Sequence, residues 1–240
     1  MNAENPKESA RRLSAPALAK GYQPEALHEY RDANGEPVLW RIRLRHPETG
    51  EKWMRPMHWN GSTYALGEPP APAEGRPLYR LPELLAADPQ APVFVVEGEK
   101  CADALARLGL IATTSGSASS ADGADWRPVQ GRNVILWPDH DDAGRKYADA
   151  VRARLSGLGA PCECLDVAAL GLSEKGDAVD WIVAHPEATA AEVLALPRAV
   201  QVEREGDGVR LLCMADVEMR PVDWLWSGWL ARGKLHILAG

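Results

Sequence analysis

Two short apolar runs, each followed at once by acidic residues, constrain the fold of this chain more than any other feature. The runs are Val93–Val96 (VFVV) and Asn133–Trp137 (NVILW). A run of four or five consecutive apolar residues is typical of a parallel strand that is buried on both faces. Further strands are predicted at 111–113 and 162–167, and helices at 99–108 and 143–158. This order predicts an α/β fold: a mostly parallel, doubly wound sheet with helices on both faces.

Carboxylates stand directly after these strands, where open α/β sheets place their ligands. Glu97 follows the first run, and Asp139 and Asp141 follow the second. Residues i and i+2 of an extended segment point the same way, so both aspartates are expected to face one space. Glu97 shares that space if the two strands are neighbours. Close carboxylates raise one another's pKa, and a hard cation such as Mg²⁺ (or Mn²⁺) relieves the repulsion by taking their oxygens as ligands.

The other polar residues of the second segment have simpler expected roles. Asp142 directly precedes the helix predicted from Ala143 and is expected to be its N-cap. His140 is expected to be structural or exposed to solvent. An aspartate after a strand is often only a helix cap, so the metal site is predicted from the set of carboxylates and not from any one of them.

The N-terminal third has a different pattern. Residues 1–26 are polar and contain proline, and we expect a flexible arm or a frayed helix there. Residues 27–80 are expected to form a small antiparallel β module that ends in a linker rich in Pro, Ala and Gly at 67–77, before a short helix at 81–85. Three turn signals divide the module into about four strands: Asn34-Gly35, 47–50 and Asn60-Gly61.

The predicted module holds the most basic and aromatic-rich patch of the sequence. Arg41, Arg43 and Arg45 alternate with apolar residues, which at a period of two places the three guanidinium groups on one face. The next strand adds Lys52, Trp53, Arg55 and Trp59. The patch is either a surface for single-stranded DNA, with arginines on the backbone and tryptophans on bases, or an ordinary solvated face. The net charge of −7 means that any nucleic-acid contact is local.

The segments VFVVEGEKCADAL and VILWPDHDDAGRKYA resemble the glutamate and Asp-x-Asp motifs of the Toprim domain, which bacterial-type primases, topoisomerases and some nucleases share. The variety that they resemble most is the Toprim primase region of phage and mobile-element primase-helicases. The resemblance covers roughly residues 90–185 of an expected catalytic domain at 81–200. It implies that Glu97 is the catalytic acid/base or a metal ligand and that Asp139 and Asp141 bind Mg²⁺.

The resemblance also implies roles for residues around these motifs. Ser115 and Gly116 would lie in a small-residue turn near the site and bind the phosphates of the nucleotide. Asp180 would be a further acidic ligand, with a helix-capping loop as the alternative. Cys101 stands where cellular bacterial primases have an aspartate, which leaves one metal or two open.

Three basic residues are candidates to bind phosphates. They are Lys100, Arg145 and Lys146, and for each of them a solvated helix face is the alternative.

Residues 201–240 are expected to be a linker and the start of a RecA-like ATPase domain, since Gly240 falls where a phosphate-binding loop would begin and the helicase domain is missing. The sequence shows no signal peptide and no apolar stretch of about 20 residues, which favours a cytoplasmic protein with no membrane partner. The four cysteines form no C-x-x-C pair, so a zinc or disulfide framework is not expected.

The sequence therefore predicts a metal-dependent DNA primase that uses nucleoside triphosphates on a single-stranded DNA template. Two alternatives stay open: a Toprim nuclease, because such a metal site also cleaves phosphodiesters, and a non-catalytic nucleic-acid-binding or regulatory module.

Overall fold

The computed structural model describes residues 4–117, 120–199, 224–226 and 230–231. The chain divides into two compact units, Met1–Val200 and Gln201–Gly240. In the second unit, β9 (Trp224–Trp226) pairs antiparallel with β10 (Leu230–Ala231). The rest of the predicted ATPase start lies outside the described residues.

The first sheet is an antiparallel meander in the order β1-β2-β3-β4, as the turn signals predict. Its strands are β1 (Gln23–Arg31), β2 (Pro37–Arg45), β3 (Lys52–Trp59) and β4 (Tyr64–Leu66). Trp40, Ile42 and Leu44 are buried on one face of β2, and the arginines alternate with them on the other face. We call residues 4–66 the antiparallel module.

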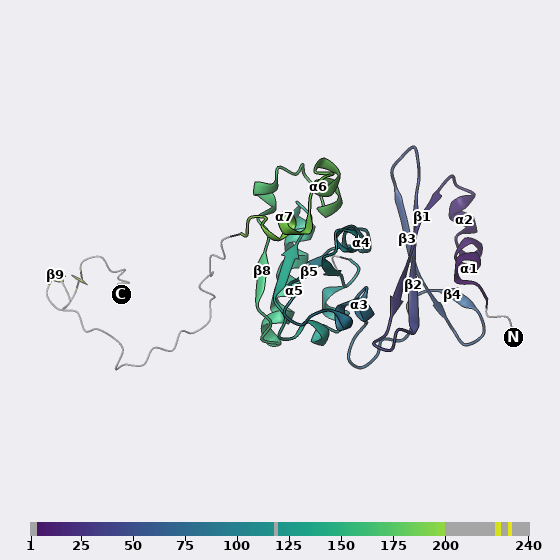
Figure 1. The fold of residues 1–240 in the computed structure, drawn as a ribbon, viewed down its shortest axis with the longest axis horizontal. Helices are drawn as coiled ribbons and strands as arrows, with labels where there is room; N and C mark the ends of the chain where they lie inside the picture. Colours follow the sequence, from purple (N-terminus) through teal and green to yellow (C-terminus); the bar gives the residue numbers. More distant parts are fainter. Residues whose placement is uncertain (1–3, 118–119, 200–223, 227–229, 232–240) are drawn as a thin grey trace, which may run out of the picture. The chain divides into compact units, whose positions relative to one another are not determined.

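Two short helices pack on the apolar face of this sheet, so of the two expectations for the N-terminal segment the helix holds and the flexible arm is wrong for the described residues. They are α1 (Pro6–Leu13) and α2 (Ala15–Leu18) (Figure 1). Asn5 caps α1, with its side chain accepting a hydrogen bond from the Lys7 amide, and Ala10 joins the core of Ile42 and Met57. Glu4 ties the chain to β4, because it accepts hydrogen bonds from the Thr63 hydroxyl and the Tyr64 amide.

The second sheet is fully parallel in the order β6-β5-β7-β8, which confirms the predicted α/β fold. Its strands are β5 (Val93–Val96), β6 (Ile111–Thr113), β7 (Val134–Trp137) and β8 (Cys162–Cys164). Strands β5 and β7 are neighbours, with Val96 opposite Trp137. Their carboxyl ends therefore meet at one edge of the sheet. We call residues 78–199 the parallel-sheet domain.

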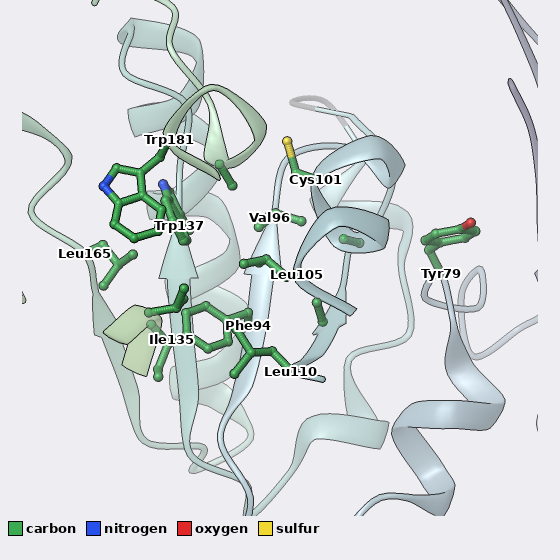
Figure 2. Packing of buried hydrophobic residues seen from close by; sticks show 14 of the residues in the cluster. Tyr79, Phe94, Val96, Cys101, Leu105, Leu110, Ile135, Trp137, Leu165 and Trp181 are labelled. Atoms are coloured by element: carbon green, nitrogen blue, oxygen red, sulfur yellow. The ribbon is translucent and has the colours of Figure 1, made fainter. Parts of the chain in front are cut away.

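Helices cover both faces of this sheet, which explains the unbroken apolar runs. Phe94, Val96, Ile135 and Trp137 belong to one buried cluster, and the residues that alternate with them belong to another. The first cluster is completed by α4 (Glu99–Arg107), α6 (Ala178–Ala184) and α7 (Ala190–Leu194), and the second by α3 (Leu81–Ala86) and α5 (Asp142–Gly157). Figure 2 shows the first cluster around Phe94 and Trp137. Short 3₁₀ turns lie at Ala121–Gly123, Arg127–Val129 and Val167–Leu170. No helix in the described part of the chain is long and apolar enough to cross a membrane.

Candidate active site

The two predicted carboxylate segments leave neighbouring strands at the same edge of the parallel sheet. Glu97 is the first residue after β5, and Asp139 is the second residue after β7. The pairing of Val96 with Trp137 fixes this arrangement through the backbone. The structure thus brings together two of the residues that the sequence singled out.

Glu97 is half-buried, and one of its carboxylate oxygens, Oε2, is buried without a hydrogen-bond partner among the described residues. Burial raises the pKa of this carboxyl, and the charge of Asp141 raises it further. Lys52, on β3 of the antiparallel module, acts in the opposite direction. An oxygen that lacks a partner in such a place is available to a ligand.

Asp139 is the most perturbed carboxylate at this edge, with its pKa raised to about 7. Burial is the largest cause, followed by the negative charges of Glu97, Asp177 and Asp141, while Lys52 again opposes the shift. Several acidic groups around a half-buried carboxylate with so little positive charge form a site that favours a cation.

Asp141 is the N-cap of α5, a role that the sequence predicted for Asp142. Its Oδ1 accepts a hydrogen bond of 2.8 Å from the Gly144 amide. Asp142 does not cap the helix; it is exposed and pairs with Arg145. Asp141 and Asp142 are adjacent at the start of the helix, so the spacing alone could not separate the cap from the first helical residue.

A second loop holds the segment Asp139–Asp141 in place. The His140 amide donates to the Gly176 carbonyl at 2.9 Å, and the Lys175 amide donates to the His140 carbonyl at 3.0 Å. The His140 ring lies against the carbonyl of Leu172 at 3.0 Å. His140 therefore has the structural role that the sequence suggested.

Asp177 is the acidic neighbour that sequence reasoning missed. It caps α6 in a capping box with Asp180, whose carboxylate accepts from the Asp177 amide at 3.0 Å. Asp180, the predicted extra ligand, is thus engaged in the cap. Asp177 instead raises the pKa of Asp139 and lies 4.0 Å from the Lys100 Nζ. The Asp-x-x-Asp spacing before an apolar run was the signal that could have identified the cap.

Cys101 lies on α4 and is buried. Burial raises the pKa of its thiol, and the charges of Asp177 and Asp139 raise it further. The neutral thiol is therefore the favoured form in the structure.

The predicted phosphate-binding residues divide into basic residues that reach solvent and loop residues that have internal hydrogen-bond partners. Lys100 is partly exposed and close to Asp177, while Arg145 and Lys146 are exposed on α5, Arg145 with Asp142 as its partner. Ser115 and Gly116 are committed elsewhere: the Ser115 hydroxyl meets the Tyr147 hydroxyl at 3.0 Å, and the Gly116 carbonyl accepts from Arg41 at 2.6 Å.

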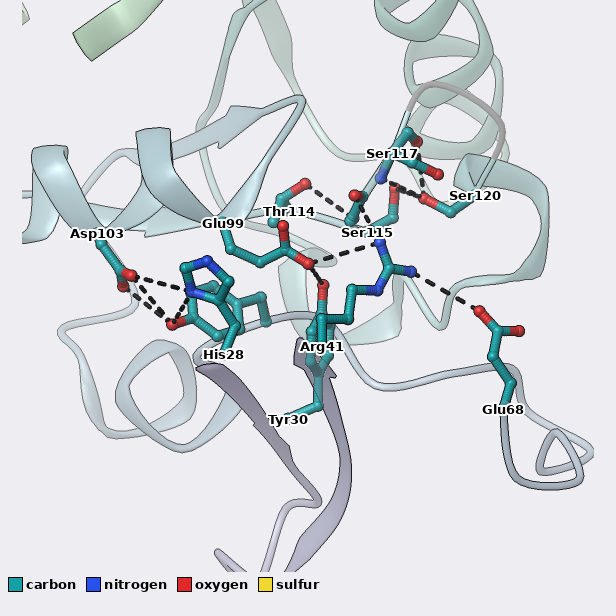
Figure 3. Close-up of polar contacts among 12 residues, drawn as sticks. His28, Tyr30, Arg41, Glu68, Glu99, Asp103, Thr114, Ser115, Ser117 and Ser120 are labelled. Carbon is teal, nitrogen blue, oxygen red and sulfur yellow. Dashed lines mark hydrogen bonds and ion pairs between the residues drawn. The ribbon is translucent and has the colours of Figure 1, made fainter. Parts of the chain in front are cut away.

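The arginines of β2 lie on one face, as predicted, but the structure gives each of them an internal partner. Arg41 turns into the parallel-sheet domain (Figure 3). Arg43 and Arg45 both donate to Glu25, at 2.6 and 3.2 Å. The alternation predicted the face, but it could not predict partners on other strands.

The predicted patch continues on β3 with Lys52, Trp53 and Arg55. Trp53 pairs with Leu44 and Arg55 with Ile42, so both belong to the apolar face, with the Arg55 guanidinium 5.5 Å from the Trp53 ring centre. Lys52 pairs with Arg45 and lies on the arginine face. It is exposed, and its charge reaches both Glu97 and Asp139.

Carboxylate oxygens are suitable ligands for a hard cation, but the positions of the described carboxylates do not form a complete coordination sphere. In the part of the chain that the structure describes, no three His, Cys, Asp or Glu side chains are placed so that they could hold a metal ion as they stand. Mg²⁺ commonly binds through only one or two carboxylates and takes its other oxygens from substrate phosphates and water. Glu97, with its unpartnered Oε2, and Asp139 fit that pattern as a pair.

Comparisons with solved structures find chains of similar fold. The fold is similar to a solved structure of the DnaG catalytic core, with a TM-score of 0.46 and 20% sequence identity. The likeness covers 72% of this chain and 53% of that chain, so this chain spans about half of the length of the protein that it matches. No protein-family model and no curated protein matches this chain.

Proposed function

We propose that this chain is a DNA primase of the Toprim type, which joins nucleotides into a primer on single-stranded DNA with the help of a divalent cation. The observation that carries the proposal is the meeting of Glu97 and Asp139 at the ends of β5 and β7. Both carboxyls have a raised pKa, and Asp177 adds a third charge beside Asp139. Such a site binds a cation and, through it, phosphate oxygens.

Glu97 and Asp139 would hold Mg²⁺ or Mn²⁺, whose chemistry there is to neutralise charge on a triphosphate and favour attack on its α-phosphorus. Asp141 keeps α5 and the loop before it in position through its bond to Gly144. Asp177 keeps the second loop in position and adds negative charge behind Asp139. Asp141 and Asp180 are therefore expected to matter more for geometry than for holding the cation.

Lys52 is the residue of the antiparallel module that we expect to bind the triphosphate. It is exposed, and it lies near enough to both carboxylates to lower their pKa. Arg43 and Arg45 are engaged by Glu25, whereas no ion pair forms at Lys52 among the described residues. A free ammonium group beside a carboxylate pair can orient an incoming triphosphate.

The single-stranded template would run along the end of β2 and β3 that carries Lys52. Arg45, its cross-strand partner, is 40% exposed in its side chain and can still reach solvent. Backbone contacts of this kind need few charges when the site is local. The resemblance to phage and mobile-element primase-helicases further suggests that a helicase domain works with this region in the cytoplasm.

The test is to incubate the protein with single-stranded DNA, labelled nucleoside triphosphates and Mg²⁺ or Mn²⁺. We expect short labelled products that need metal and template, and that disappear in Asp139→Asn. The matched control is Asp142→Asn, which changes an exposed carboxylate at the first residue of α5, three residues from Asp139, and should leave the products unchanged. Shortened template without new product would instead favour a nuclease. Neither product nor cleavage would favour a non-catalytic module.

A further inference from the structure

A buried carboxylate joins the antiparallel module to the parallel-sheet domain. Glu99, at the start of α4, is fully buried and accepts a 2.7 Å hydrogen bond from the Tyr30 hydroxyl. The Arg41 Nη1 lies 3.5 Å from the same oxygen, Oε1. Tyr30 is on β1 and Arg41 on β2, so two strands of the module converge on one side chain of the other domain (Figure 3). The other oxygen of the Glu99 carboxylate, Oε2, is buried without a hydrogen-bond partner among the described residues.

The same arginine also holds the loop after β6. Its Nη1 donates to the Gly116 carbonyl at 2.6 Å. Gly116 has a φ of +108°, and a β-carbon there would lie 2.5 Å from Arg41 Nη1 and 2.6 Å from the Tyr30 hydroxyl oxygen. Only glycine combines this backbone conformation with so close an approach. The contact therefore depends on the absence of a side chain at residue 116.

Apolar packing and a second polar contact support the same junction. Tyr30 and Leu39 lie in the buried cluster that contains Leu105 of α4. His28, two residues before Tyr30 on β1, lies 3.4 Å from Asp103 of α4. The junction is thus a packed interface and not a single bridge.

Lys52 is connected to the junction through the pairing of β3 with β2, the strand that carries Arg41. Arg41 and Arg45 are on one face of β2, about 13 Å apart at the usual rise of a strand, and Lys52 lies opposite Arg45. On the other side, Glu99 is two residues from Glu97. Arg41 and Glu99 therefore form one of the contacts that connect the strand pair carrying Lys52 to the strand end that carries Glu97.

We propose that Glu99, Tyr30, Arg41 and Gly116 form an interdomain clamp whose task is to hold the antiparallel module, and with it Lys52, in a fixed position against the parallel-sheet domain that carries Glu97 and Asp139. These four are positioning residues, since they reach the site only through Lys52 and the strand that carries it. The catalytic part of this inference rests on the proposed primase function, whereas the fixed spacing of the two domains does not.

The test uses Gly116→Ala, which inserts a β-carbon into the clamp, and Gly109→Ala as its matched control. Gly109 also has a positive φ, +82°, but nothing lies within 4 Å of its would-be β-carbon. Tyr30→Phe removes only the hydroxyl and serves if Gly116→Ala does not fold. Spin labels on unnatural residues at Thr49, in the β2–β3 turn, and Ser156, on α5, report the distance between the domains.

We expect one narrow distance distribution in the wild-type protein and in Gly109→Ala, and a shifted or broadened one in Gly116→Ala and Tyr30→Phe. Primer synthesis should fall by up to about 100-fold in the clamp variants, as expected for a displaced binding group. Lys52→Ala should cause no further loss in the Gly116→Ala background.

Unchanged distances in both clamp variants would overturn the clamp. If the double variant lost primer synthesis by the product of the two single-variant losses, Gly116→Ala and Lys52→Ala would act independently. That result would overturn the proposal that the clamp acts through Lys52. If the wild-type protein makes no primer, the proposed function fails, and the distance distributions alone decide whether the clamp exists.

Discussion

Gly144 packs directly against the backbone of Asp139. A β-carbon on Gly144 would lie 2.7 Å from the Asp139 amide nitrogen and closer still to its carbonyl oxygen. The first turn of α5 and the candidate ligand are therefore in contact through main chain alone. The small residue in the sequence Asp-Ala-Gly is what lets the helix begin so near the site.

Gly144→Ala should destabilise the protein by about 1–3 kcal/mol, because the backbone of Asp139 must move to make room. Gly157→Ala, at the other end of α5, is the control: nothing lies within 4 Å of its would-be β-carbon. That change should be neutral or stabilise by up to about 1 kcal/mol. Urea unfolding of both variants measures the difference, and equal stabilities would show that the close approach is absent.

The raised pKa of Asp139 predicts a pH-dependent effect on stability. Asp139 keeps its proton in the folded protein to about pH 7, while the unfolded chain releases it near 3.8. Folding stability from this group is therefore lost as the pH rises through that interval. With a chelator present, Asp139→Asn should match the wild type near pH 4 and exceed it in stability at pH 7 to 8.

Added Mg²⁺ should narrow that gap at pH 7 to 8, because a cation that binds the folded wild type stabilises it. Thermal unfolding at several pH values, with and without Mg²⁺, checks both statements. A gap that does not change with pH would mean that Asp139 is not perturbed in the folded protein.

Lys52→Ala should lower kcat/KM for nucleoside triphosphate by about 10- to 100-fold, the value of one charge-assisted hydrogen bond. Lys52→Arg should retain most of the activity, since it keeps the charge. Lys20→Ala is the control, because Lys20 is exposed in the turn after α2. Steady-state primer synthesis at varied triphosphate concentration is the measurement, and an unaffected Lys52→Ala would exclude Lys52 from the site.

Glu25→Gln should strengthen binding to single-stranded DNA. Glu25 pairs with both Arg43 and Arg45, and of the two only Arg45 is substantially exposed. Releasing Arg45 should add about one phosphate contact, so the slope of log affinity against log salt should steepen by about 0.7. Fluorescence anisotropy at several salt concentrations measures the slope, and Glu36→Gln, exposed in the β1–β2 turn, is the control. An unchanged slope would place the DNA elsewhere.

The sequence was most informative where a local pattern, such as a run of apolar residues or a turn pair, is enough to predict a strand or a hairpin. The apolar runs of β5 and β7 predicted strands buried on both faces, and the turn pairs such as Asn34-Gly35 predicted the meander. The meeting of Glu97 and Asp139 was only a conditional expectation, because β6 lies between β5 and β7 in the chain and the pairing of β5 with β7 is a crossover.

Long-range polar partners could not be read in the same way. The alternation of Arg41 and Arg43 gives their face, but their partners Glu99 and Glu25 come from other elements. Nothing in the local pattern of Glu99 shows that it faces the antiparallel module and not solvent. The clamp therefore became visible only in three dimensions.

Helix α1 shows a missed local signal. Asn5 at the cap, Pro6 in the first turn and two arginines in the last turn form a recognisable helix pattern. What the sequence does not show is that Glu4 reaches β4 and fixes the helix on the sheet.

The most direct test of the central claim measures bound Mn²⁺ and primer synthesis in the same preparations of wild type, Glu97→Gln, Asp139→Asn and Asp180→Asn. We expect Glu97→Gln and Asp139→Asn to lose both the bound Mn²⁺ and the primer, and Asp180→Asn, which changes only the cap of α6, to keep both. A Glu97→Gln protein that makes primer at the wild-type rate would contradict the account.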